Sequence, residues 1–193
     1  MSKQAQFTKE RIIGACLEII RSDGPDALSA RSICKKLGCS VAPLFWVFEN
    51  MEQLLGEVRK AAQTLFIDYV ADSIDYVPAF KEFGIRLIRF SREEPGLFHY
   101  LFLEKDAEVG FADSVITECL KRIEPHFGLS SEQSGFIFRQ IWPFACGLAG
   151  LCNRAPGLYT EEMVSQMLSN QFQALLMLVK SGKEVVNIIP KIL

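Results

Sequence analysis

The sequence predicts an all-α protein built from about nine helices. Apolar residues recur at helical spacing along most of the 193-residue chain, and no stretch alternates between apolar and polar residues as a half-buried strand does. Glycine, proline, asparagine and serine fall between the helical stretches, where they mark turns. We expect two domains, a small one over residues 1–58 and a larger one over residues 59–193.

The composition is that of a soluble globular protein, with 49% hydrophobic and 23% charged residues. The polar segment at residues 1–10 lacks the apolar run of a signal peptide. The most apolar stretch, residues 136–151, is interrupted by Arg139 and Gln140 and is shorter than a bilayer span requires. We therefore expect a cytoplasmic protein with no membrane partner.

Capping residues mark the first two helices. Thr8 fits the N-cap of a helix that ends near residue 21, before a Ser-Asp-Gly-Pro turn. Ser29 fits the N-cap of a short second helix, and Gly38 ends that helix because glycine adopts the left-handed conformation of a helix end.

The later helices follow from the same signals. Ser40 is expected to cap a third helix, with Pro43 in its first turn, where the missing N–H costs little. Asn50 and Gln53 fit a capping box at the start of a fourth helix. Apolar spacing extends that helix over about residues 51–75 and predicts five more, at about residues 79–92, 95–103, 111–127, 131–154 and 160–181.

Charge is distributed unevenly along the chain. Residues 1–48 carry seven Lys or Arg against four Asp or Glu, whereas residues 61–193 carry twelve against sixteen. A mildly basic head on an acidic body fits a protein that contacts a polyanion at one end only.

Two short helices meet at a tight turn through Gly38, within residues 28–48. Four apolar residues would hold this pair together: Ile33, Leu37, Leu44 and Phe48. A helix-turn-helix of this kind places its second helix in the major groove of DNA, with the N-terminal residues of that helix facing the base edges.

Residues 8–58 resemble the N-terminal part of the tetracycline-repressor (TetR) family of bacterial regulators. The resemblance rests on ordered motifs, in register over about fifty residues: Ile-Ile-x-Ala-Cys-Leu-Glu-Ile-Ile at 12–20, Asp23-Gly24, Leu28-Ser29-x-Arg31-x-Ile33, Leu37-Gly38-Cys39-Ser40, Leu44-Phe45-Trp46-x-Phe48 and Asn50-x-Glu52-x-Leu54-Leu55. It implies a homodimer that binds a pseudo-palindromic operator on double-stranded DNA.

The resemblance also implies which residues contact DNA. Arg31 would contact a phosphate or a guanine edge, and Ser40 with nearby backbone N–H groups would meet a phosphate at a helix N-terminus. The implied DNA-binding residues are Ser29, Arg31, Ser40, Val41, Ala42, Pro43, Phe45 and Trp46.

The expected recognition helix departs from the family pattern. Phe45 stands where the family often has Tyr, Val47 where a polar residue is frequent, and Met51 where a Lys commonly contacts the DNA backbone. Recognition then relies on thymine methyl groups and DNA shape, or the affinity is modest. Phe48 fits the core, whereas Trp46 fits either the core or the DNA face.

Residues 141–151 resemble a Trp, His-Gly, Leu pattern in the C-terminal ligand-binding domain of some family members, with Cys146 in place of His. The small residues here are Cys146, Gly147, Ala149 and Gly150. Small residues let another helix approach closely, so we expect the last two long helices to form a dimer interface. Ordinary packing within the chain is the alternative.

Aromatic residues are frequent in the helices that would surround a cavity, and the chain contains fifteen Phe. An apolar pocket with few polar groups suggests a small hydrophobic ligand. The alternative is that these residues only fill the core. The expected ligand-binding residues are Phe98, His99, Phe102, Phe138, Trp142 and Met167.

No residue pattern predicts catalysis or a cofactor. The sequence has no G-x-S-x-G motif, no Gly-rich phosphate loop and no clustered metal ligands. The six cysteines lack C-x-x-C spacing, and most fit small buried hydrophobes, although Cys34 and Cys39 fit a redox pair.

Together these observations predict a DNA-binding transcriptional regulator, and they favour a repressor over an activator. A small hydrophobic effector is expected either to release it from its operator or to retain it there. The alternative is a dimeric helical module that binds a protein or a ligand and carries a degenerate DNA-binding head.

Overall fold

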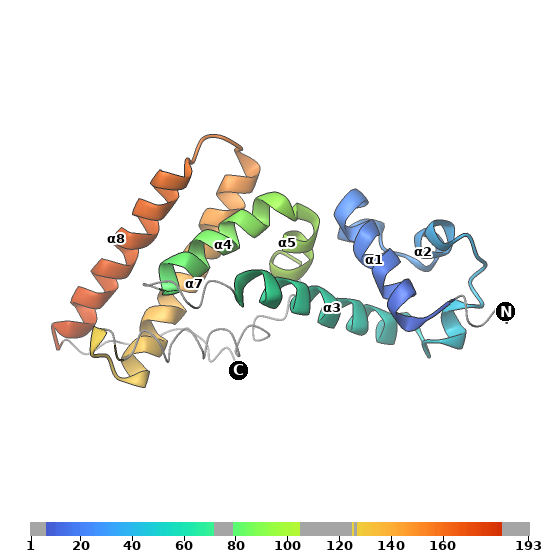
Figure 1. Cartoon of the computed structure of the whole chain (residues 1–193), viewed down its shortest axis with the longest axis horizontal. Coiled ribbons are helices and arrows are strands. Elements are labelled where there is room, and N and C mark those ends of the chain that lie inside the picture. Colours follow the sequence, from blue (N-terminus) through green and yellow to red (C-terminus); the bar gives the residue numbers. More distant parts are fainter. Residues whose placement is uncertain (1–6, 72–78, 105–124, 126, 183–193) are drawn as a thin grey trace. The chain divides into compact units, whose positions relative to one another are not determined.

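The structure is a computed structural model that describes residues 7–71, 79–104, 125 and 127–182. These residues form seven α-helices and two 3₁₀-helices, without a strand (Figure 1). The all-α prediction is confirmed. The expected helix at residues 111–127 lies almost entirely outside the described residues, as does the end of the expected 51–75 helix.

The chain forms two compact units. Unit 1 comprises Met1–Phe66 and Glu94–Glu108, and unit 2 comprises Ile67–Glu93 and Val109–Leu193. The expected boundary at residue 58 therefore differs from the boundary of the compact units, because a later helix returns to pack against the N-terminal ones. As the end of a DNA-binding domain, residue 58 stays a prediction.

Unit 1 is built on α1 (Lys9–Asp23), which contacts three other elements of that unit. These are η2 (Pro25–Ala27), α2 (Ala30–Leu37) and α5 (Pro95–Phe102). Ile12, Cys16 and Ile20 are fully buried along one face of α1, as the helical spacing predicted. Thr8 is the N-cap, since its Oγ1 accepts a hydrogen bond of 3.3 Å from the Arg11 N–H.

α5 is fastened to α3 (Met51–Ala71) as well as to α1. The Arg59 guanidinium of α3 lies over the Tyr100 ring at 4.5 Å from its centroid. Arg59 also pairs with Glu104 at 3.0 Å, and the Tyr100 hydroxyl donates to the Leu55 carbonyl oxygen at 3.3 Å. These polar contacts surround fully buried apolar residues of α5 such as Phe98.

Unit 2 has a core of three mutually contacting helices, α4 (Ala79–Glu93), α7 (Ser131–Arg154) and α8 (Glu161–Lys180). The buried Ser91 hydroxyl of α4 donates to the Ile88 carbonyl oxygen at 2.7 Å, and at 3.3 Å to the Ala149 carbonyl oxygen of α7. Ser130 caps α7 through a capping box with Gln133. Thr160 caps α8.

Among the described helices, α7 is long and apolar enough to cross a membrane, but half of its most apolar window is buried within the protein. Its buried residues, among them Phe136, Ile141 and Leu148, form part of the core of unit 2. We therefore interpret α7 as a core helix.

Candidate functional site

The start of α2 is shaped by two serines. The Ser29 Oγ accepts from the Ser32 N–H at 3.2 Å, and the Ser32 Oγ accepts from the Ser29 N–H at 2.9 Å. The Ser32 hydroxyl also lies 2.7 Å from the Ala27 carbonyl oxygen, to which it can donate. Ser29 is therefore the N-cap that the sequence predicted, although its partner is Ser32 and not a Glu or Gln.

The turn after α2 depends on Gly38, which has φ 67° and ψ 37°. A residue with a side chain rarely adopts this left-handed conformation, so glycine is required here. Beyond the turn, Leu44 is fully buried and Phe48 is 3% exposed, and both lie in the core with Ile33. The core packing expected for Ile33, Leu44 and Phe48 is confirmed, whereas Leu37 is half-buried.

The expected third helix is not an α-helix. It is a pair of tight turns that ends in η3 (Leu44–Trp46), in which the Leu44 N–H bonds to the Val41 carbonyl oxygen at 3.1 Å. The prediction that Ser40 caps a helix is wrong, because the N-cap of η3 is Pro43 and no side chain caps it. The Phe45 N–H likewise bonds to the Ala42 carbonyl oxygen at 3.1 Å, so these bonds span three residues and not the four of an α-helix.

Three large apolar side chains of this segment are exposed. Trp46 is 56% exposed, and Val41 and Phe45 are each 43% exposed. Trp46 therefore lies on the surface of unit 1 and not in its core, and its contact with DNA stays a prediction. Five of the expected DNA-binding residues in this segment are exposed, and we call them the reading face: Ser40, Val41, Ala42, Phe45 and Trp46.

Pro43 is a correction to the expected DNA-binding residues. It is buried within the subunit, so its ring cannot belong to the reading face. Pro43 and Leu44 are both buried, whereas Ala42 and Phe45 on either side of them are exposed.

The unit that carries the reading face also carries two exposed cations of α2. Arg31 and Lys35 are exposed, and neither forms an ion pair with another residue in the described part of the chain. They lie four positions apart, on one side of the helix. Lys36, by contrast, pairs with Glu18 at 2.9 Å. Lys35 was not among the expected DNA-binding residues, although its spacing from Arg31 could have indicated it.

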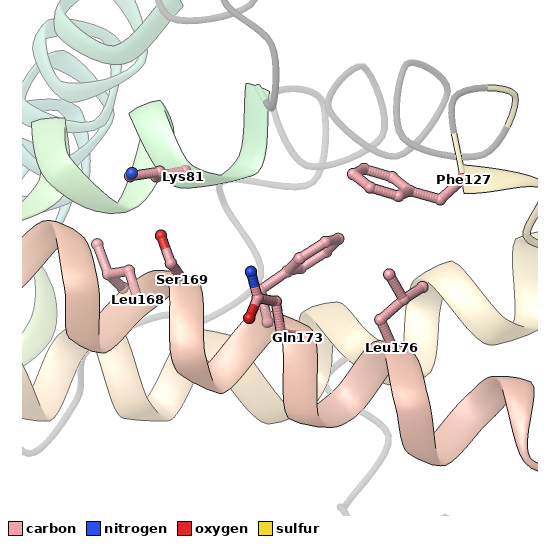
Figure 2. Close-up of a pocket in the computed structure, with 7 residues that line it drawn as sticks. Lys81, Phe127, Leu168, Ser169, Gln173 and Leu176 are labelled. Carbon is pink, nitrogen blue, oxygen red and sulfur yellow. The ribbon is translucent and has the colours of Figure 1, made fainter.

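Unit 2 contains a pocket of about 320 Å³ between α4 and α8. Figure 2 shows Lys81 of α4 on one side and a row of α8 residues on the other. The Phe127 and Phe172 rings lie 5.0 Å apart between centroids. The lining residues are Lys81, Phe127, Leu168, Ser169, Phe172, Gln173 and Leu176.

The pocket is apolar with a cationic group at one side. Lys81 is half-buried and forms no ion pair with a described residue. The Ser169 hydroxyl already donates to the Ser165 carbonyl oxygen at 2.9 Å. A bound molecule would therefore find mostly hydrocarbon, with the Lys81 amine and the Gln173 amide as polar groups.

Solved structures of bacterial regulators have the same architecture. A tetR-family transcriptional regulator from Streptomyces coelicolor matches with a TM-score of 0.67 at 20% sequence identity, over 92% of this chain and 86% of that one. A putative transcriptional regulator from Pseudomonas aeruginosa PAO1 matches with a TM-score of 0.66 at 16% identity, over 88% and 90%. The chain has the TetR-regulator fold.

A third structure with this fold is that of the fatty acid degradation regulator FadR from Bacillus halodurans. It matches with a TM-score of 0.61 at 12% identity, over 91% of this chain and 96% of that one. No protein-family model and no curated protein sequence matches the chain.

The six expected ligand-binding residues divide between the two units of this TetR fold. In unit 1, Phe98 is buried, His99 is exposed, and the Phe102 ring lies 5.1 Å from both the Phe98 and Phe66 rings. These ring contacts match the packing of an aromatic core.

In unit 2, the Trp142 ring lies 5.8 Å from both the Phe138 and Phe83 rings, and Met167 is half-buried on α8. None of the six expected residues lines the pocket of about 320 Å³. The residues that do line it escaped sequence reasoning, because α4 and α8 are far apart in the chain and only tertiary packing brings them together. The role of the six in ligand binding stays a prediction.

Two of the small residues of α7, Gly147 and Gly150, have open space around them in the described part of the chain. A Cβ added at Gly147 or at Gly150 would meet no other atom within 4 Å. On the same helix, Leu151 is 48% exposed, and on α8 Met177 is 73% exposed. The dimer interface expected on the last two long helices stays a prediction.

The described cysteines are free, and Cys119 lies outside the described residues. Cys16 and Cys152 are fully buried, as expected for thiols that fill core space. Burial raises the pKa of both the Cys16 and Cys146 thiols to about 12. Among the described residues no group of three or more His, Cys, Asp or Glu is placed to hold a metal ion.

Proposed function

We propose that the protein is a one-component DNA-binding transcriptional regulator, a repressor by preference, and not an enzyme. The observation that carries the proposal is the exposed reading face on a helix-turn-helix, in the same unit as two exposed cations that form no ion pair with a described residue. The shared fold with structures named as transcriptional regulators supports it. A regulator of this kind works in the cytoplasm, where its DNA is.

On DNA, the cations and the reading face would do different work. Arg31 and Lys35 would neutralise phosphates or, for Arg31, bond a guanine edge. Val41, Phe45 and Trp46 would contact apolar groups such as thymine methyls, because they carry few hydrogen-bonding atoms. Ser29 and Ser40 are exposed and can meet phosphate oxygens.

We further propose a homodimer built from the exposed faces of α7 and α8. Leu151, Met163 and Met177 are large apolar side chains that water contacts in the isolated chain. Covering them with a second copy removes apolar surface from water, at about 25 cal/mol per Å². A two-fold pair of reading heads would then match a pseudo-palindromic operator.

The effector site of the proposed regulator is the pocket between α4 and α8. Leu168, Phe172 and Leu176 favour a hydrophobic molecule, and Lys81 favours one with a polar or negatively charged end. Binding would act on DNA affinity only if the molecule binds more tightly to one of two conformations of the dimer.

A gel-shift experiment with the DNA that flanks the protein's own gene tests the function. We expect a retarded band that survives an excess of unrelated DNA and weakens steeply as salt increases. Absence of any specific band at low salt, from a protein that is folded by circular dichroism, would overturn the proposal.

The second candidate function is a helical module that binds a protein or a ligand and has a degenerate DNA-binding head. The exposure of Val41, Phe45 and Trp46 also favours this candidate, since an apolar patch can contact a protein as well as DNA. A folded dimer that binds no DNA fragment in the gel shift would favour it.

A further inference from the structure

Cys34 and Cys39 are held close together by a backbone hydrogen bond at the end of α2. The Cys39 N–H donates to the Cys34 carbonyl oxygen at 3.0 Å, across the left-handed residue Gly38. This is the six-residue bond of a Schellman motif, in which the side chains of the two bonded residues commonly touch. A disulfide needs Cα atoms about 4.4–6.8 Å apart, and a direct backbone bond of this kind keeps two residues close.

The two thiols also interact directly. Burial raises the pKa of the Cys34 thiol, and the Cys39 thiol raises it further through its charge and a side-chain hydrogen bond. Cys34 is 6% exposed, whereas Cys39 is half-buried and open to small molecules. A small disulfide in solution can therefore reach the Cys39 thiol more easily than the Cys34 thiol.

The pair touches the first residue of the reading face. The Cys34 S–H donates to the Ser40 carbonyl oxygen at 3.4 Å. A disulfide at Cys34 would remove this donor and draw Cys39, the neighbour of Ser40, toward α2.

We propose that Cys34 and Cys39 form a reversible disulfide that rearranges the reading face. The oxidant is a low-molecular-weight disulfide such as oxidised glutathione. Only the resulting change in DNA binding depends on the function proposed above; the disulfide and the rearrangement do not.

The reaction proceeds by two thiol–disulfide exchanges. The Cys39 thiolate attacks one sulfur of oxidised glutathione, so that a mixed disulfide forms and one glutathione thiolate leaves. The Cys34 thiolate then attacks the Cys39 sulfur, and the second glutathione thiolate leaves. The two protons of the protein thiols end on the two glutathiones, so the protein loses two electrons and oxidised glutathione gains them.

Peptide mapping tests the bond itself. The full chain is equilibrated with reduced and oxidised glutathione, free thiols are blocked by alkylation, and trypsin is added. Trypsin cleaves after Arg31, Lys35 and Lys36, so the disulfide would join the peptide of residues 32–35 to that of residues 37–59. We expect this linked pair to form and to separate on addition of dithiothreitol. Persistence of only glutathione adducts, or of free thiols at both positions, would overturn the proposal.

Single variants test the order of the two steps. Cys34→Ser should stop at a glutathione adduct on Cys39, since no second thiol can displace it. Cys39→Ser should form adducts at Cys34 at least tenfold more slowly, because Cys34 is buried. Equal adduct rates at the two positions would contradict the roles assigned to the two thiols.

Tryptophan fluorescence tests the rearrangement without DNA. The chain has two tryptophans, so Trp142→Phe leaves Trp46 of the reading face as the only one. Oxidation should change its emission, and the Cys39→Ser version of the same variant should not respond. A mapped disulfide with unchanged Trp46 emission would overturn the link to the reading face. If the reduced protein binds no DNA, the proposed regulator function is contradicted, but the disulfide and the rearrangement are not.

Discussion

The backbone of Gly96 lies directly against the carbonyl oxygen of Ile20, so close that a Cβ on Gly96 would overlap that oxygen. This contact seats the start of α5 on the end of α1. Beside it, the Arg21 Nε donates to both carboxylate oxygens of Glu94, at 2.9 and 3.1 Å. A helix distant in sequence thereby becomes part of the unit that carries the reading face.

Gly96→Ala should therefore destabilise unit 1, because the clash is with backbone and no side chain can move aside. Overpacking of this kind costs about 1–3 kcal/mol, and we expect a lower thermal unfolding temperature. Gly56→Ala is the matched control, since a Cβ there meets nothing within 4 Å and alanine favours the helix. Equal unfolding temperatures for the two variants would contradict the close approach of α5 to α1.

Arg31→Ala and Lys35→Ala should weaken DNA binding. The loss should be about 1–3 kcal/mol if Arg31 reads a guanine edge, and for a phosphate contact it should be smaller and lower the salt slope by about one. Lys36→Ala is the control, because the Lys36 amine is already paired with Glu18 at 2.9 Å. Fluorescence anisotropy over a salt series measures all three. Unchanged affinity in both Arg31→Ala and Lys35→Ala would remove these residues from the interface.

Substitutions at Trp46 and Phe48 should have opposite effects on DNA affinity and on the free energy of unfolding. Trp46 is 56% exposed and Phe48 is 3% exposed. Trp46→Ala should leave the free energy of unfolding nearly unchanged and reduce DNA affinity, whereas Phe48→Ala should destabilise the fold by about 3–5 kcal/mol. Urea unfolding and anisotropy make the comparison. A large loss of stability in Trp46→Ala would place its side chain in the core.

Gly147→Glu should disrupt the proposed dimer. A charge without a partner would be buried at the centre of the α7 face, where a pair of helices would otherwise meet, and burying an unpaired charge is strongly unfavourable. Sedimentation should show monomers, and insoluble protein would agree with the same cause. Gly56→Glu, at an exposed position of α3, should leave the assembly unchanged. An intact dimer in Gly147→Glu would move the interface elsewhere.

Lys81→Met should reduce binding of an apolar anion to the pocket between α4 and α8. The amine is half-buried and has no ion-pair partner in the described part of the chain, so it is available to an anionic group. Titration with the fluorescent probe anilinonaphthalene sulfonate measures the affinity. Lys180→Met, at the exposed end of α8, is the control for overall charge. Equal affinities for the two variants would show that Lys81 does not contact the probe.

The sequence by itself determined the features that depend on neighbouring residues. Thr8 and Ser29 cap helices as predicted, because a cap needs only a side-chain oxygen two or three residues before an N–H. Gly38 ends α2 for a similarly local reason, its freedom to adopt positive φ. The Asn50 Oδ1 accepts a hydrogen bond of 2.8 Å from the Gln53 N–H, as the predicted capping box requires. The Gln53 Oε1, however, accepts from the Glu49 N–H and not from the Asn50 N–H.

Tertiary structure decided what depends on distant residues. Pro43 is buried and Trp46 is exposed because the turns after Gly38 must fit the core under α2, and helical periodicity does not describe those turns. The pocket beside Lys81 exists because α4 meets α8, so its lining could not be deduced from either helix alone. Local signals set where helices begin and end, whereas the exposure of each side chain is set by long-range packing, which a single sequence pattern does not encode.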